Sequence, residues 1–320
     1  MKIDLHLYPT PPYDFQRSFS YLEPCADPVC SYDGTTFQRL WPLGRGRLAH
    51  LTLSSLGTVE KPRLKLRLAA ESLSEEDVAN CARRAEEIFC LKLDLRKFYR
   101  TIKKDKTLYA HTQRNIGLKP VLEPTLFEAL TWAIIGQQVN LRFACVVKQG
   151  MLERFGQKRK MNGQTFYGYP EPADLAGQNP DSWREFKSSR RKAEYIIGLA
   201  DLLQDGFDLE GLKRLSDEKI IEELVKIRGI GRWTAEYVLI QGFGRWDALP
   251  VGDAGLVNGI RRAYGLKHRP DEKEVEAMGE RWRPYRGLAT YYLWWGKQFK
   301  HEDAKNHKAK ATIKQPPKMS

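Results

Sequence analysis

The sequence has no hydrophobic run long enough to cross a membrane. A transmembrane helix requires about 20 consecutive apolar residues, and no run approaching that length occurs in the 320 residues. The opening segment, MKIDLHLYPTPPYDF, also lacks the apolar centre of a secretory signal peptide. These absences exclude an integral membrane protein, and we expect a cytoplasmic protein without a membrane partner.

Cysteine and histidine are too few and too scattered to indicate a metal centre. Cys25 and Cys30 are the nearest pair in the sequence, and a structural zinc site would need two further ligands close to them. The six histidines do not show the spacing of a metal-binding motif either. We therefore expect no metal enzyme and no cofactor, and we expect free thiols in a reducing compartment at all five cysteines: Cys25, Cys30, Cys81, Cys90 and Cys145.

Acidic residues are outnumbered by basic ones. The chain has 53 Lys and Arg against 40 Asp and Glu, which gives a formal net charge of +13. Such a balance favours a polyanionic partner, although many basic proteins have none. Eight Trp and fourteen Tyr offer rings on which nucleobases could stack. Because no Gly-Lys-Ser/Thr loop for a nucleoside triphosphate occurs, a nucleic acid is the favoured polyanion.

The first part of the chain, residues 1–115, predicts an α+β domain with a small antiparallel sheet. The segment RLWPLGRGRLAHLTL is typical of a strand, a glycine-containing turn and a second strand, and PRLKLRLAAE of another strand. Residues 72–91 predict a helix that Ser74 caps, because Glu75 and Glu76 follow in its first turn.

The following region, residues 116–300, predicts mainly helices, so the expected fold class is mainly α. Apolar residues recur at helical spacing after Pro124, and Gly136-Gln137-Gln138 separates two helices. Residues 156–180 are rich in Gly, Gln and Pro and predict a loop. Residues 301–320 are rich in Lys and poor in large apolar residues, which predicts a disordered tail.

The centre of the helical region is a helix-hairpin-helix element at about residues 218–240. An apolar-periodic run ends at Gly229-Ile230-Gly231, a second run follows, and a turn rich in Gly and Pro leads to Asp253. The two glycines allow a backbone turn with positive φ and a close approach to a partner. The first N–H groups of the second helix form an anion site, for which a nucleic-acid phosphate is the favoured ligand and simple helix packing is the alternative.

The segments GIGRWTAEY and LPVGDAGL resemble the helix-hairpin-helix, Gly/Pro-rich loop and aspartate signature of a DNA glycosylase superfamily. Within it the chain is most similar to the bacterial 3-methyladenine DNA glycosylase II type, over about residues 115–300. The resemblance implies a base excision repair hydrolase that flips out an alkylated purine, cleaves its N-glycosidic bond and leaves an abasic site. It also implies a monomer on damaged double-stranded DNA, associated with a bacterial nucleoid.

Asp253 is the expected catalytic residue. Cleavage of an N-glycosidic bond builds positive charge on the sugar, and an ionised carboxylate below the sugar can stabilise that charge and orient a water. The alternative reading is a helix N-cap, since Asp before a helix is a strong cap. Both roles can hold at once.

The resemblance assigns an aromatic slot for the damaged base to Trp233, Tyr237 and Trp294. An alkylated base carries positive charge, which aromatic faces attract. In lyase relatives a lysine stands at the place of Trp233, so a Schiff-base step has no matching amine here. Lys226, upstream on the other hairpin helix, is a weak substitute, and Trp282 is expected in the core.

DNA contacts are expected at the hairpin and at a wedge. The backbone amides of Gly229 and Gly231, with Arg232 and Thr234 beside them, should hold phosphate. The place of the family's wedge, a leucine in the best-known type, is taken by Gln138, a departure that leaves the substrate range open.

Two further candidate binding sites are expected, one for a cation and one for a phosphate. The family hairpin holds a monovalent cation, sodium or potassium, through three carbonyls that match Val225, Ile227 and Ile230. A basic helix start, at residues 190–192, is a candidate phosphate patch, with a solvated turn as the equal alternative.

Two other functions compete with this reading. One is an oxidised-purine glycosylase with lyase activity, and the other is a non-catalytic helix-hairpin-helix module that only binds DNA.

Overall fold

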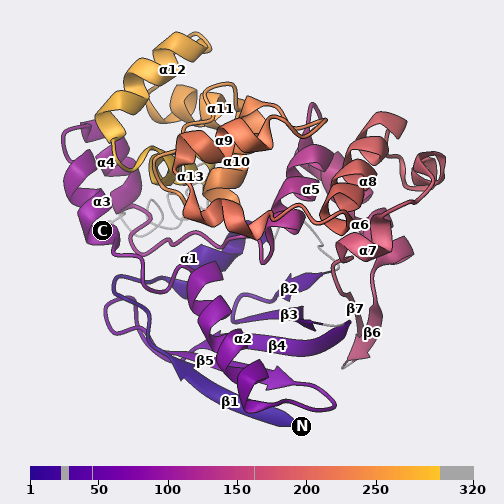
Figure 1. Cartoon of the computed structure of the whole chain (residues 1–320). Helices are drawn as coiled ribbons and strands as arrows, with labels where there is room; N and C mark the ends of the chain where they lie inside the picture. The colour runs from indigo at the N-terminus through magenta and orange to yellow at the C-terminus, as the bar shows by residue number, and fades with distance from the viewer. Residues whose placement is uncertain (23–28, 45, 162, 296–320) are drawn as a thin grey trace, which may run out of the picture.

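A five-stranded antiparallel sheet lies at one end of the molecule and the helices lie above it (Figure 1). The computed structural model describes residues 1–22, 29–44, 46–161 and 163–295. The strands follow the order β1-β5-β4-β3-β2. Their bounds are β1 (Lys2–Leu7), β2 (Cys30–Tyr32), β3 (Thr36–Gly44), β4 (Arg47–Ser55) and β5 (Leu64–Ala69). The expected small antiparallel sheet and its strand-turn-strand segment are therefore confirmed.

Helix α2 (Glu75–Ile88) covers the sheet. As predicted, Ser74 caps it, accepting a hydrogen bond from the Asp77 N–H while Asp77 reaches back to the cap. Cys81, Ala85 and Ile88 are buried in one cluster with the inward side chains of the strands. Alternation along the strands and helical spacing along α2 thus place both apolar faces on one core.

Most of the other elements are helices, as the pattern predicted. The N-terminal part contains α1 (Phe15–Phe19), α3 (Leu95–Ile102) and α4 (Lys106–Gln113). The helices around the hairpin are α5 (Leu126–Gly136), α6 (Leu141–Phe155), α7 (Pro172–Leu175), α8 (Arg190–Gln204), α9 (Asp217–Leu224) and α10 (Arg232–Gln241). The last three are α11 (Ala254–Ala263), α12 (Glu272–Gly279) and α13 (Arg286–Trp295). Short 3₁₀ turns lie at Ser20–Leu22, Pro180–Phe186, Glu210–Arg214 and Glu280–Trp282.

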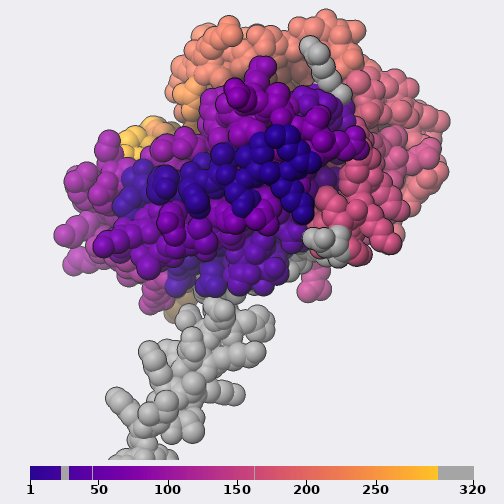
Figure 2. Space-filling model, turned by 90° about the horizontal axis from the view of Figure 1, so that it is seen from below, coloured from indigo at the N-terminus to yellow at the C-terminus, as the bar shows by residue number. Residues whose placement is uncertain are grey.

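The helices enclose two further cores. One joins α5, α6, α8, α9 and α10. The other joins α3 and α4 to α11, α12 and α13, and it contains Trp282, which is fully buried as expected. Packing therefore crosses the expected boundary between residues 1–115 and 116–300. Figure 2 shows the indigo and purple surface of the N-terminal part across one face, with the pink surface of the α6–α8 region beside it.

A buried ion pair connects the sheet to the helices. Arg39 on β3 donates from Nη2 to both carboxylate oxygens of Glu128 on α5, at 2.7 and 3.0 Å. The side chains are 7% and 1% exposed, so the pair is shielded from water. Because α5 also borders the site described below, this contact holds the two halves of that site together.

Two expectations from the sequence need correction. The loop expected over residues 156–180 contains a hairpin of β6 (Lys158–Met161) and β7 (Gln164–Tyr167), which its polar, short strands concealed. Cys145 is disulfide-bonded, so the prediction of free thiols is wrong there, whereas Cys30, Cys81 and Cys90 form no disulfide and Cys25 lies outside the described residues. Linear spacing could not reveal the pairing because it depends on which residues the fold brings together.

Two remaining expectations concern the C-terminal tail and membrane-spanning helices. The predicted disordered tail, residues 301–320, lies outside the described residues. In the described part of the chain, every helix is too short or too polar to pass through a bilayer.

Candidate active site

Asp253 is held at the start of α11 by three hydrogen bonds. Its Oδ1 accepts from the Leu256 N–H at 2.6 Å, which makes it the N-cap of the helix. The indole Nε1–H of Trp294 donates to the same oxygen at 2.6 Å, and that of Trp233 donates to Oδ2 at 3.2 Å. The cap and the predicted site residue are therefore one side chain. A carboxylate has about four lone-pair positions, so it keeps acceptor capacity for a further ligand.

The close contact between Asp253 and α13 requires a glycine at position 255. A Cβ there would lie 2.8 Å from the Asp253 Oδ1 and 2.8 Å from the Trp294 Cδ1. Any larger residue would force the indole away from the carboxylate.

The three aromatic residues of the predicted slot adjoin one another. Trp233 and Tyr237 lie one helical turn apart on α10, and their ring centroids are 5.7 Å apart. The ring centroid of Tyr237 lies 5.6 Å from that of Trp294 on α13. Burial raises the pKa of the Tyr237 hydroxyl, and the nearby Glu123 charge raises it further. The slot thus remains neutral and electron-rich while Asp253 lies at its edge.

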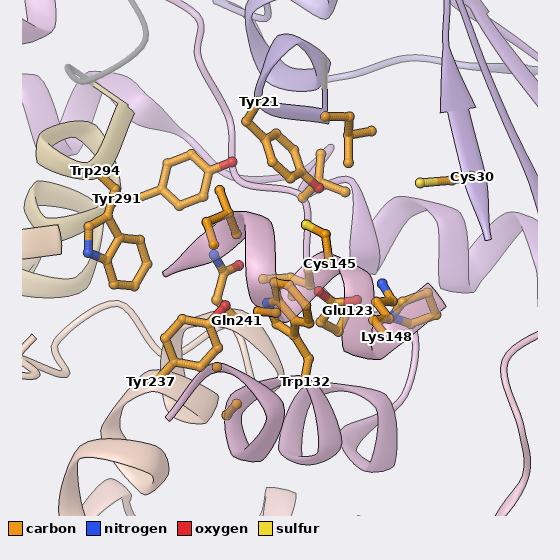
Figure 3. Close-up of a pocket in the computed structure, with 18 of the residues that line it drawn as sticks. Tyr21, Cys30, Glu123, Trp132, Cys145, Lys148, Tyr237, Gln241, Tyr291 and Trp294 are labelled. Carbon is orange, nitrogen blue, oxygen red and sulfur yellow. The ribbon is translucent and has the colours of Figure 1, made fainter. Parts of the chain in front are cut away.

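A cavity of about 510 Å³ contains this slot and extends beyond it. Figure 3 shows Tyr237, Tyr291 and Trp294 along one side, with Trp132, Glu123 and Lys148 on the other. The N-terminal part contributes apolar side chains that include Phe37, Trp41 and Phe89. The site is therefore shared between the sheet and the helical region.

Sequence reasoning missed the residues on the far side of the cavity. Trp132 lies on α5 and Lys148 lies on α6, and the sequence pattern of these helices does not distinguish the two residues from their neighbours. Glu123 precedes α5 in a proline-rich segment. A usable signal was nevertheless that Lys148 falls among the apolar residues of α6, since lysine is almost never buried without a partner. In the structure its side chain is 8% exposed.

The hairpin between α9 and α10 has the expected turn, with one difference. Gly229 has a φ of +92°, whereas Gly231 is the extended N-cap of α10 with a φ of −93°. Only the first glycine therefore needs the freedom that both were expected to use. Ile230 between them is 4% exposed and packs in the helical core, as predicted.

Gly229→Ala is expected to destabilise the hairpin. The new Cβ would lie 2.2 Å from the Tyr195 ring, and the left-handed conformation costs a non-glycine residue about 1–3 kcal/mol. Thermal unfolding should show a lowered Tm, and duplex affinity should fall with it. Gly231→Ala is the matched control, since its Cβ would meet nothing within 4 Å. Equal Tm values for the two variants would contradict this account.

The other expected DNA contacts surround a second cavity, of about 390 Å³, at the hairpin. Gln138 lines it, is exposed, and has a φ of +56° in the α5–α6 loop. The adjacent Gln137 fixes this loop, because its Nε2 donates to the Gly229 carbonyl at 2.9 Å and to the Thr234 hydroxyl at 3.1 Å. The predicted wedge and the hairpin are therefore neighbours.

Thr234 and Arg232 differ in what they can offer a phosphate. Thr234 is 1% exposed, so its hydroxyl positions Gln137 and only its backbone amide lies in the first turn of α10. The Arg232 side chain is 74% exposed and its Nε donates to Glu236 at 2.9 Å. A guanidinium has five donors, so this contact leaves capacity for a phosphate.

The basic start of α8 is largely engaged within the protein. Arg190 forms ion pairs with Asp181 and Glu194. The Lys192 ammonium donates to the carbonyls of Ile135 and Gln137, both at 2.7 Å, and so supports the wedge loop. The phosphate patch expected at residues 190–192 is thus reduced to Arg191, which lines the hairpin cavity and contacts Tyr195.

The carbonyls expected to bind a monovalent cation lie at the end of α9 and in the hairpin. The Ile227 carbonyl accepts the Ile230 N–H at 3.0 Å. A carbonyl oxygen has two lone pairs, so cation binding by Val225, Ile227 and Ile230 stays a prediction.

The sequence and the fold of this chain are similar to those of known proteins. Residues 131–284 match the family model of the HhH-GPD superfamily base excision DNA repair proteins. A DNA-3-methyladenine glycosylase of Bacillus subtilis is 35% identical over 209 residues, which cover 65% of this chain and 69% of the relative. A second Bacillus subtilis protein, YfjP, is 30% identical over 288 residues, covering 89% of this chain and 96% of the relative.

Among solved structures, a 3-methyladenine DNA glycosylase from Archaeoglobus fulgidus shares the fold. Its TM-score is 0.81 at 23% identity, and the alignment covers 92% of this chain and 99% of that one. An 8-oxoguanine glycosylase/lyase from Clostridium acetobutylicum has the same general fold, with a TM-score of 0.71 at 17% identity and coverage of 94% and 98%.

Proposed function

This chain belongs to the HhH-GPD superfamily of base excision DNA repair proteins, and we propose that it releases alkylated purines from duplex DNA through Asp253 without a lyase step. It is a base excision repair glycosylase that acts on alkylated bases, a hydrolase of the N-glycosyl bond. The observation that carries the mechanism is the placement of one carboxylate at the edge of an aromatic slot, held by indole N–H groups from two helices.

Duplex DNA would bind across the hairpin and the α5–α6 loop. The first N–H groups of α10 have no partner within the helix and lie at its positive end, where a phosphate is favoured. Gln138 lies beside them and would fill the space left by the extruded base. Extrusion costs a few kcal/mol, and a damaged base costs the least.

The extruded base would lie against Trp233, Tyr237 and Trp294. Alkylation at a ring nitrogen makes a purine cationic, and each aromatic face attracts it by about 0.5–2 kcal/mol. An undamaged, neutral purine gains less from the same faces. Alkylation also weakens the glycosidic bond, so the slot selects bases that leave readily.

Asp253 would then act on the sugar. As the bond to the base lengthens, positive charge develops on the sugar ring, and the carboxylate is placed to stabilise it. Its hydrogen bonds from Trp233, Trp294 and Leu256 hold it in position without using all of its acceptor capacity. A water oriented by the same carboxylate would complete the hydrolysis.

The site lacks an amine where lyase relatives carry theirs. Trp233 occupies that position, and its indole N–H is committed to Asp253. Lys226, the nearest lysine on the hairpin, has a 66% exposed side chain and pairs with Glu223 at 2.7 Å. We therefore expect an abasic-site product with an intact strand.

Incubation with dimethyl-sulfate-treated DNA tests this function. We expect free 3-methyladenine in the supernatant, measured by chromatography, and no covalent protein–DNA adduct after borohydride treatment. A trapped adduct would overturn the monofunctional mechanism and favour the lyase alternative. DNA binding without any released base would leave only the non-catalytic module.

A further inference from the structure

The cavity is larger than its aromatic slot, and its far side is ionic. Among the described residues, four charged side chains line it: Arg39, Glu123, Lys148 and Asp253. The slot aromatics account for stacking of the base, and Asp253 accounts for the contact with the sugar. Glu123 and Lys148 have no part in that chemistry, although Figure 3 shows them across the cavity from Tyr237 and Trp294.

The surrounding structure holds the backbone of Glu123 and the side chain of Lys148. The backbone N–H of Glu123 donates to the Gln241 carbonyl at the end of α10, at 2.8 Å. The Lys148 Nζ lies 5.3 Å from the Trp132 ring centroid and 4.0 Å from the Glu128 Oε1. The two charges also reach the slot, because Glu123 raises the pKa of Tyr237 and Lys148 lowers it, behind the dominant effect of burial.

The pair presents an acceptor and a donor to whatever enters the slot. A carboxylate can accept about four hydrogen bonds and an ammonium can donate three, so each group can serve a ligand as well as its partners within the protein. A base whose sugar lies at Asp253 and whose ring stacks on Trp233 and Tyr237 would turn its outer edge toward this side of the cavity. Extruded bases are commonly read by hydrogen bonds to that edge.

We propose that Glu123 and Lys148 read the outer edge of the extruded base and favour 6-oxopurines, such as 7-alkylguanine, over adenine derivatives. The carboxylate would accept both the N1–H and an N2–H of a guanine-type base, and the ammonium would donate to O6. An adenine derivative offers the carboxylate only its N6–H. This inference rests on the proposed function and adds a specificity that stacking alone does not supply.

The ratio of two released bases measures this specificity directly. Dimethyl-sulfate-treated DNA contains 7-methylguanine and 3-methyladenine in one substrate, so each serves as the internal reference for the other. Glu123→Gln keeps the size of the side chain but replaces one acceptor oxygen with an N–H₂ donor. That amide opposes N1–H of guanine, whereas it matches the N6–H and N1 of adenine.

In Glu123→Gln we expect the ratio of 7-methylguanine to 3-methyladenine release to fall by about tenfold or more, since sites built around hydrogen bonds discriminate strongly. A duplex with hypoxanthine, which lacks the N2 amine, should show a smaller loss. Glu153→Gln, on the exposed face of α6, is the matched control and should leave the ratio unchanged.

Lys148→Met provides a second, independent readout. Removal of the donor to O6 should reduce the release of 7-methylguanine and of hypoxanthine, with the Tm measured to confirm folding. Ratios within about twofold of the parent in both variants would overturn the proposal. If the parent protein released neither methylated base, the proposed function itself would have failed, which is a separate result.

Discussion

Asp253→Asn should abolish base release while the protein still folds and binds duplex DNA. Removal of one preorganised electrostatic group of this kind costs on the order of 10²–10³ in rate. The amide has no net charge to set against the cationic sugar. Its N–H₂ group would also face an indole N–H donor, from either Trp233 or Trp294, where the carboxylate now accepts.

Stability should change little, because asparagine is as good an N-cap as aspartate. The Leu256 N–H can still be accepted by the side-chain oxygen. Single-turnover release of 3-methyladenine, with duplex affinity and Tm measured alongside, separates chemistry from folding. Asp271→Asn is the matched control, since Asp271 caps α12 in the same way. Parental activity in Asp253→Asn would remove Asp253 from the mechanism.

Arg39→Met should destabilise the protein by about 3–5 kcal/mol. Loss of one partner from a buried ion pair leaves the other charge desolvated, and that uncompensated charge is the main cost. The Lys148 ammonium would remain 4.0 Å from the Glu128 carboxylate and would still offset part of its charge, so the loss should lie toward the lower end of this range. Urea denaturation followed by circular dichroism measures it.

Two comparison variants identify the cause. The double variant Arg39→Met/Glu128→Leu should recover much of the loss, since apolar replacements of a whole buried pair are often tolerated. Arg67→Met breaks an exposed pair with Asp4 on the same sheet, with side chains 47% and 37% exposed, and should destabilise the protein far less than Arg39→Met. Equal losses in Arg39→Met and Arg67→Met would show that burial is not the cause.

Local signals in the sequence predicted much of this protein. The hairpin glycines, the cap at Ser74 and the periodic helices on either side of the hairpin depend on a few neighbouring residues, so they can be predicted from a linear chain. Tyr237 follows Trp233 by one helical turn, so their ring contact could be expected as well. The signature around Asp253 added the chemistry, through resemblance.

Local signals failed where partners are distant in the sequence. The β6–β7 hairpin has short polar strands without an apolar alternation, and the disulfide at Cys145 depends on tertiary contacts. Thr234 read as a phosphate ligand because it follows the hairpin, yet the fold buries its hydroxyl against Gln137.

The sequence by itself determined the hairpin, the capped helices and the identity of the one carboxylate beside it, because each depends on neighbours along the chain. Only the tertiary structure decided what surrounds that carboxylate. Trp294 arrives from the last helix, and Glu123 and Lys148 from segments that precede the hairpin. Such a cavity forms when separate apolar faces pack together, and its polar lining is whatever those faces leave inside.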